Sequence, residues 1–152
     1  MKWIAKDIEM FDGAREYVDT ALVPLVGISF SEGIKQSAST SEYITILSNE
    51  IEKQFKGRVM LLPSIMYNLN WEKQEKTELL IKWKRILQEE KFSHIFFLTA
   101  DGQMNVNDEL NESILWSTSI PLEHLEEKYK KPMMEEQVKN MLNTIIEKWR
   151  IK

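Results

Sequence analysis

Short runs of apolar residues alternate along this chain with longer stretches in which apolar residues recur at helical spacing. Continuous runs rich in Val, Ile, Leu and Phe are typical of strands buried on both faces of a parallel sheet. Such runs occupy residues 21–30, 58–62, 92–99 and 114–120. We expect the first strand to span about six residues and to begin after Pro24, because proline has no N–H to donate to a central ladder.

Amphipathic stretches flank these runs and predict helices. Apolar residues at helical intervals predict helices over residues 7–20, 72–90 and 135–149. A further helix precedes the second strand, because Ser39 and Glu42 have the spacing of a capping box and Gly57 marks a helix end. We expect residues 64–71 to form a loop.

The alternation of buried strands with amphipathic helices predicts an α/β fold. Right-handed crossovers between parallel strands give a three-layer α/β/α sandwich, flavodoxin-like or Rossmann-like, with a small, mostly parallel four-stranded sheet. We predict the strand order 2-1-3-4, numbered along the chain. The fourth strand is either parallel or antiparallel, because no clear helix precedes it. The predicted core comprises Val26, Ile28, Leu47, Ile51, Val59, Leu61, Leu80, Trp83, Ile95, Phe97, Leu142 and Ile145.

Composition places the chain among folded proteins. Hydrophobic residues make up 43% and charged residues 29% of its 152 residues, and no internal repeat, low-complexity tract or Pro/Gly-rich linker occurs. We therefore expect a single α/β domain over residues 1–152.

Charge and cysteine content indicate which classes of partner and which cellular compartment are expected. The net charge of −4 argues against nucleic acid, whose phosphates call for a basic surface, and against anionic membranes. The absence of cysteine excludes disulfides and thiolate chemistry and suits a reducing, cytoplasmic setting. The first residues lack the apolar stretch of a signal peptide, and the longest apolar run, residues 21–28, is too short for a transmembrane segment.

Three short segments resemble a known family. Met-Lys-Trp-Ile at residues 1–4, Tyr-Val-Asp-Thr-Ala-Leu-Val-Pro-Leu at residues 17–25 and His-Ile-Phe-Phe at residues 94–97 are similar to the YpiF-like family of small proteins from Bacillus-type bacteria. The likeness covers most of the chain. That family is a domain of unknown function, so the resemblance implies a bacterial cytosolic setting and supplies no catalytic, ligand-binding or cofactor residue.

The sequence contains no recognisable catalytic motif. The loop after the first strand could hold a phosphate at a helix N-terminus, but it lacks the glycines of a phosphate loop, and Glu32 would repel an anion. Ser64, Asp101 and His124 occur in the chain order of α/β-hydrolase triads. The residues around Ser64 are proline and isoleucine, however, and not the glycines of a nucleophile elbow.

Metal and cofactor sites are likewise not indicated. The only histidines, His94 and His124, have no zinc-site spacing, and we expect neither to be essential to any activity. Asp101, Asp108 and Glu109 could bind Mg²⁺, although a solvated acidic loop is the favoured interpretation. We therefore predict no metal and no cofactor.

Polar residues follow the predicted strands at their carboxyl ends. In open α/β sheets, ligands bind in the crevice beyond these ends, where the strand order reverses. We expect Ser31 and Asp101 to flank this reversal and Ser64 and Tyr67 to lie nearby. The candidate ligand-binding residues are Ser29, Ser31, Ser64, Tyr67, Asn68 and Asp101, which suit a small polar molecule. Loops are also polar simply because they are solvated.

Two classes of function remain. The favoured one is a non-enzymatic regulatory or protein-interaction domain, because no catalytic constellation is found. Trp3 and Trp71 fall at the edges of predicted elements, where exposed aromatic side chains could contact a protein partner. The alternative is a domain or enzyme that binds a small polar molecule in the crevice. The sequence specifies no oligomeric state.

Overall fold

The computed structural model describes residues 1–104 and 107–151. Its principal elements are α1 (Ala5–Asp12), β1 (Thr20–Ile28), α2 (Ile34–Gln54), β2 (Val59–Leu61), β3 (Ile65–Asn68), α3 (Lys73–Glu89), β4 (His94–Thr99), β5 (Ile114–Trp116) and α4 (Glu127–Arg150). Two single 3₁₀ turns, Asn111–Ser113 and Leu122–His124, precede β5 and α4.

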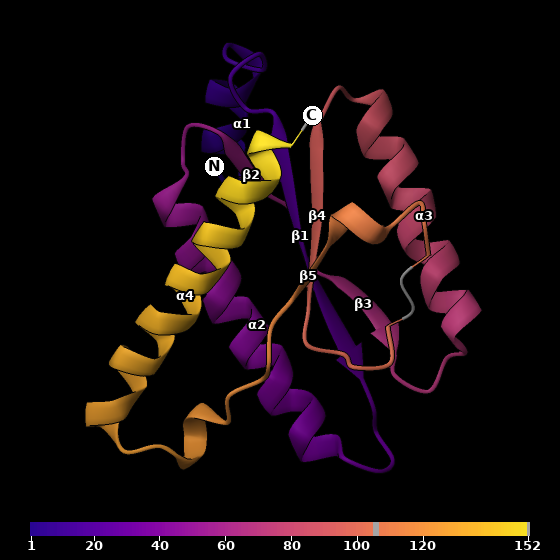
Figure 1. The fold of residues 1–152 in the computed structure, drawn as a ribbon, viewed down its shortest axis with the longest axis vertical. Helices are drawn as coiled ribbons and strands as arrows, with labels where there is room; N and C mark the ends of the chain where they lie inside the picture. Colours follow the sequence, from indigo (N-terminus) through magenta and orange to yellow (C-terminus); the bar gives the residue numbers. More distant parts are fainter. Residues whose placement is uncertain (105–106, 152) are drawn as a thin grey trace.

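The strands form one parallel sheet in the order β2-β1-β4-β5, and β3 also pairs in parallel with β1. α2 and α4 lie on one side of the sheet and α3 lies on the other (Figure 1). Residues of α1 pack in the same core cluster as residues of α3. The expected α/β fold and the order of its four predicted strands are confirmed, and β5 runs parallel to β4.

β1 is longer than expected, because Pro24 lies inside it. On the side of β1 away from β4, two short strands follow one another, and a gap separates them beside Pro24, since β2 ends at Leu61 and β3 begins at Ile65. The N–H of Leu62 donates to the carbonyl of Leu22 at 2.9 Å, so alternate backbone groups of β1 face this gap. The missing N–H of Pro24 therefore falls where no neighbouring strand needs it.

The expected loop over residues 64–71 was wrong, because it contains β3. Residues 65–68 pair in register with residues 25–28 of β1. Asn68 and Asn70 give this segment the polar character of a loop, so the pairing with the distal half of β1 makes residues 65–68 a strand.

The helices differ from the predicted ones mainly at their ends. α1 stops at Asp12, before Gly13, and does not continue to Thr20. α2 begins after Gly33, whose φ of 71° is left-handed, so Ser39 and Glu42 lie inside the helix and do not cap it. α4 begins at Glu127, well before the predicted start.

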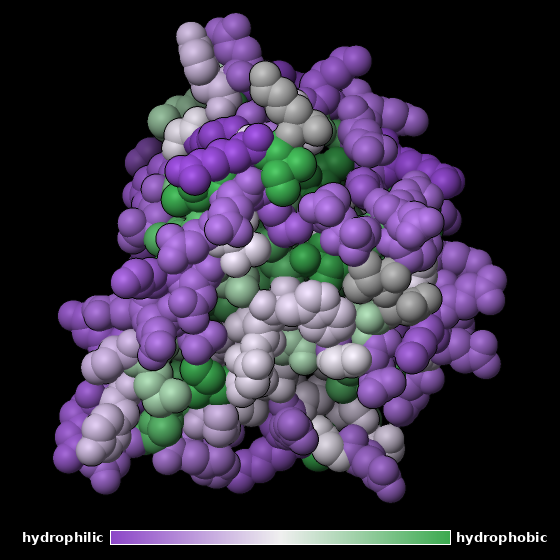
Figure 2. All heavy atoms as spheres, in the orientation of Figure 1, coloured by the Kyte–Doolittle hydropathy of each residue, from purple (hydrophilic) through white to green (hydrophobic). Residues whose placement is uncertain are grey.

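The core lies on both faces of the sheet. On the α2/α4 face, Tyr43, Ile44 and Leu47 are completely buried. On the α1/α3 face, Leu80 and Phe97 are buried to 1% and 0% exposure. The expected core residues that the structure leaves partly or largely exposed are Val26, Ile28, Trp83 and Leu142. Hydrophilic residues dominate the surface seen in Figure 2, where hydrophobic residues show through in separate patches.

Candidate functional site

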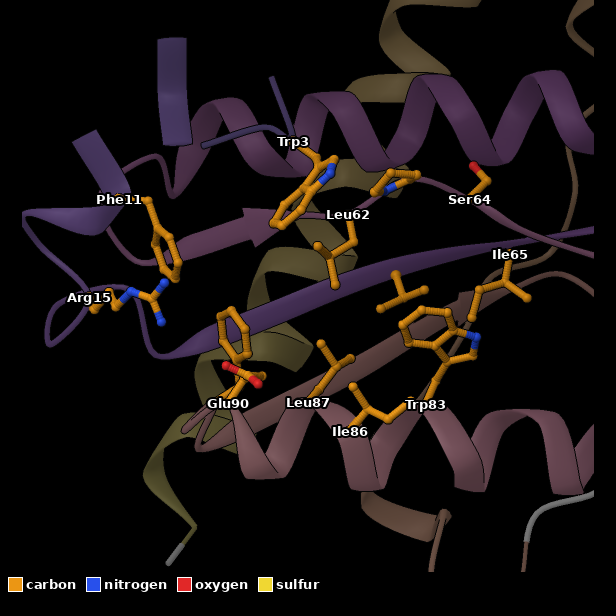
Figure 3. Close-up of a pocket in the computed structure, with 13 residues that line it drawn as sticks. Trp3, Phe11, Arg15, Leu62, Ser64, Ile65, Trp83, Ile86, Leu87 and Glu90 are labelled. Carbon is orange, nitrogen blue, oxygen red and sulfur yellow. The ribbon is translucent and has the colours of Figure 1, made fainter. Parts of the chain in front are cut away.

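A groove with apolar walls lies on the α1/α3 face of the sheet. Its cavity has a volume of about 430 Å³. Val23 of β1 and the segment between β2 and β3 line one part of it, and α3 and the N-terminal part of the chain line the rest. Figure 3 shows the side chains of Trp3, Leu62 and Trp83 gathered around the same space. We call this cavity the apolar groove.

The stripe of α3 that lines the apolar groove is only partly buried. Its members follow one another at helical spacing, at positions 83, 86 and 87. Leu87 is 6% exposed, whereas Trp83 and Ile86 are each 41% exposed. Across the groove, Trp3 is 56% exposed. Large apolar side chains therefore face solvent from both walls.

The α1 end of the apolar groove carries its charged groups. Phe11 stacks on Phe92 with ring centroids 6.1 Å apart, and the guanidinium carbon of Arg15 lies 4.9 Å from the Phe11 ring centroid. Arg15 also forms an exposed ion pair with Asp12 at 3.0 Å. Glu90, directly after the end of α3, supplies a negative charge to the same lining. This arrangement suits neutral apolar groups, with one cation and one anion at the rim.

A second, polar cavity lies at the carboxyl ends of β1 and β4, and we call it the C-terminal crevice. Its volume is about 270 Å³. The chain leaves β1 through α2 to reach β2 on one side, and α3 leads to β4 on the other side, so the strand order reverses here. The polar side chains in its lining include Glu32, Ser37, Thr40, Thr99 and Asp101.

Asp101 belongs to a buried cluster with Tyr67 and Lys76. The hydroxyl of Tyr67 donates to Oδ2 of Asp101 at 2.7 Å, and Nζ of Lys76 donates to the same oxygen at 3.0 Å. The side chains of Lys76 and Asp101 are 2% and 8% exposed. Oδ1 of Asp101 accepts from the backbone N–H of Gln103 at 2.8 Å. Both carboxylate oxygens therefore have partners within the protein.

The cluster shifts the pKa of two of its members. Burial works to raise the pKa of Asp101, but hydrogen bonds from Tyr67, Gln103 and Lys76 outweigh it and hold the pKa below its usual value. Burial, reinforced by the hydrogen bond to Asp101, raises the pKa of Tyr67 far above its usual value. At neutral pH the carboxylate is thus ionised and the phenol is protonated.

The structure distributes the predicted ligand-binding residues over several places. It brings Tyr67 and Asp101 into direct contact. The hydroxyl of Ser29 donates to the carbonyl of Glu32 at 2.8 Å, and Oδ1 of Asn68 accepts from the N–H of Asn70, also at 2.8 Å. The two remaining predicted residues lie elsewhere. Ser31 is exposed on its loop, and Ser64 lines the apolar groove.

The other residues considered for chemistry form no constellation in the described part of the chain. His94 is half-buried beside Phe96, with ring centroids 6.3 Å apart. His124 is exposed next to Glu123, and within residues 1–104 and 107–151 it forms no hydrogen bond or ion pair with Ser64 or Asp101. No group of three or more His, Asp or Glu side chains suited to a metal ion occurs within those residues.

No helix within residues 1–104 and 107–151 has both the length and the apolar character needed to cross a membrane.

The apolar groove was missed by sequence reasoning. Trp83 was assigned to the core because it lies on the apolar stripe of α3. The stripe alone does not show how much of it another element covers, and the facing helix, α1, has only eight residues. The exposed position of Trp3 at an element edge was the one available signal.

Together, the parallel sheet, its two helical layers and the two cavities define an α/β protein of the open-sheet class. Residues 9–149 match the family described as "Protein of unknown function (DUF2487)", and the chain belongs to this family. The chain is 34% identical over 152 residues to the uncharacterised protein YpiF of Bacillus subtilis strain 168, and the matched region covers 98% of each of the two chains. The resemblance to the YpiF-like family is thereby confirmed. No solved structure matches the chain.

Proposed function

We propose that this protein is a non-enzymatic interaction domain that binds a partner protein through the apolar groove. The observation that carries the proposal is the pair of exposed tryptophans, Trp3 and Trp83, on opposite walls of one apolar cavity. Tryptophan is enriched among the residues that contribute most to binding at protein interfaces. A cavity of about 430 Å³ accepts large apolar side chains and has the size typical of binding pockets.

The groups at the rim support a protein segment as the occupant. Arg15 and Glu90 carry opposite charges, and Arg15 is already paired with Asp12, so the rim selects neither an anion nor a cation. The apolar surface also extends beyond the cavity to Ile4, which is 52% exposed next to Trp3. Neutral apolar side chains presented on a polypeptide match this surface.

The setting of this interaction belongs to the same proposal. We expect the protein to act as a single domain over residues 1–152 in a bacterial cytoplasm. The absence of cysteine suits a reducing compartment, and the net charge of −4 favours a protein partner over nucleic acid. The relative in Bacillus subtilis supports a bacterial origin.

The test uses short random peptides displayed on phage and selected on the full chain. Selected peptides are then measured against Trp83→Ala and against the matched control Trp116→Ala. Both tryptophans are 41% exposed, but Trp116 lies on β5, at the far edge of the sheet from the groove. We expect Trp83→Ala to weaken binding about tenfold or more, equivalent to about 1.4 kcal/mol, and Trp116→Ala to leave it unchanged.

Two outcomes contradict this proposal. One is the selection of no peptide that binds the folded chain. The other is a set of peptides whose affinity is insensitive to Trp83→Ala or is lowered equally by both substitutions. Circular dichroism of each variant verifies that the fold is retained.

A second candidate function is the binding of a small polar molecule in the C-terminal crevice. The observation that favours it is the set of carboxylates and hydroxyls at the point where the strand order reverses, with Asp101 among the residues proposed to contact the ligand and Tyr67 behind it, hydrogen-bonded to Asp101. We expect NMR shift mapping with a library of polyols and small amines to perturb Thr40 and Gly102. Perturbations confined to the opposite edge, near Arg58 and His94, would contradict this candidate.

A further inference from the structure

One edge of the sheet is already extended by another segment of this chain. β2 and β3 follow one another along the same side of β1. On the outer side of β2, Lys2 forms a parallel bridge with Leu61, and the N–H of Leu61 donates to the carbonyl of Met1 at 2.8 Å. The N-terminal residues therefore add to this edge as an extra strand would, but they cover only β2.

The outer side of β3 offers the same kind of backbone groups. The N–H of Leu69 donates to the carbonyl of Ile28 at 3.0 Å, and Gly27 is in register with Tyr67. Because backbone groups alternate in direction along a parallel strand, those of residues 65, 67 and 69 face β1 and those of Met66 face away. In the described part of the chain, the N–H and C=O of Met66 have no hydrogen-bond partner on that outer side.

Apart from its short length of four residues, the edge of β3 lacks the usual protection against pairing. Natural edge strands are commonly blocked by lysine, by proline within the strand or by a bulge. The four residues of β3 are Ile, Met, Tyr and Asn, and Met66 is 71% exposed. Pro63 precedes the strand and does not interrupt it.

The open edge lies next to the apolar groove. Ile65, the first residue of β3, and Ser64 before it both line the groove. Alternate residues of a strand point to the same face of a sheet, so a strand added beside β3 would project every second side chain toward the α1/α3 face. The groove would then receive apolar side chains at alternate positions.

We propose that the partner is an extended peptide segment that adds as a strand to the outer edge of β3 and places alternate apolar side chains in the apolar groove. This proposal rests on the proposed function and names the form of its partner. Backbone hydrogen bonds to the N–H and C=O of Met66 and to the N–H of Asn68 hold the segment, and the groove selects its side chains. The carbonyl of Asn68 already accepts from the N–H of Trp71 at 3.1 Å. The segment continues the edge that Met1 and Lys2 already extend beside β2.

Amide hydrogen exchange of the full chain tests this mode directly. The probe is a phage-selected peptide whose binding depends on Trp83. We expect the N–H groups of Met66 and Asn68 to exchange about tenfold or more slowly when the peptide is bound, because it supplies their missing acceptors. The N–H of Tyr67 faces β1 and serves as an internal reference that is protected in both states.

The possible results separate this inference from the proposed function. A Trp83-dependent peptide that leaves the exchange of Met66 and Asn68 unchanged, or that binds as a helix, overturns strand addition but retains the groove as a binding site. Failure to obtain any Trp83-dependent peptide overturns both proposals.

A pair of substitutions at one position gives an independent test. Met66→Pro removes an N–H that points away from β1, so the β1–β3 ladder keeps its hydrogen bonds. Met66→Ala shortens the side chain and keeps the N–H. We expect Met66→Pro to weaken peptide binding about tenfold and Met66→Ala to change it less than about twofold. Equal effects of the two substitutions contradict strand addition. If Met66→Pro does not fold, the hydrogen-exchange experiment alone decides between the two outcomes.

Discussion

The two faces of the sheet are covered to different degrees. On one face, α2 and α4 contain 21 and 24 residues, which correspond to about 32 and 36 Å of helix. On the other, α3 has 17 residues and α1 has 8, so α1 extends only about 12 Å. Side chains of α2 such as Ile44 and Leu47 are completely buried, whereas Trp83 and Ile86 of α3 are 41% exposed.

This difference shows how an apolar helix stripe can serve two purposes. The residues of α2 that face the sheet are buried in one cluster with residues of the sheet and of α4, and they contribute to stability. Part of the α3 stripe is left open by the short α1 and is available to a partner. The face that is less completely packed is thus the one on which we place the binding function.

The largest expected effect concerns the buried cluster of the α1/α3 face. Asp101→Asn leaves the ammonium of Lys76, which is 2% exposed, without its carboxylate partner. We expect the free energy of unfolding to fall by about 3–5 kcal/mol in urea titrations, since an uncompensated buried charge is costly. The control is Asp19→Asn, because the Asp19–Arg58 pair is 30% and 40% exposed and should contribute at most about 1 kcal/mol. Equal losses would show that the cluster is not buried as described.

The same cluster predicts a dependence of stability on pH. The pKa of Asp101 lies below its usual value of 3.8 in the folded protein, so its contribution is fully present above pH 3.8. That contribution is lost as the pH falls through the folded pKa. We expect the stability difference between wild type and Asp101→Asn to shrink as the pH is lowered below 3.8, in urea or thermal unfolding. A difference that stays constant with pH contradicts this assignment.

The contrast between the faces is tested by truncating one apolar side chain on each. Leu47→Ala on the closed face should lower the free energy of unfolding by about 2–5 kcal/mol, because the side chain is fully buried and leaves a cavity. Ile86→Ala on the open face should cost less than about 1 kcal/mol, because the side chain is already 41% exposed. Similar losses in urea unfolding would contradict the difference in packing.

The smallest effect is expected at His124, in the turn before α4. Its side chain is 64% exposed and its nearest charged partner, Glu123, lies 3.7 Å away. We expect His124→Gln to change the free energy of unfolding and the peptide affinity by no more than about 0.5 kcal/mol. A larger effect on affinity with unchanged stability would indicate a role for this histidine in binding.

The periodicity of apolar residues along the chain was sufficient to predict the sheet and most of the helices that cover it. The apolar runs around Val59, Phe97 and Leu115 are strands, and their order agrees with prediction. These elements were predictable because a strand buried on both faces, or a helix with one apolar stripe, imposes its own local pattern. The contact between Tyr67 and Asp101 was anticipated only as proximity at the carboxyl ends of strands.

Features that depend on partners distant in sequence were not predictable. Pro24 is accepted in the central strand because the neighbouring strand is interrupted beside it, and residues 65–68 form a strand because β1 extends past β2. The pairing of Lys76 with Asp101 requires α3 to pack over the end of β4. Trp83 carries the same helical signal as a core residue, and its exposure follows from the length of a different helix. Local patterns thus specify which elements form and which faces are apolar, but only the packing of distant segments establishes which apolar surface is closed and which remains open.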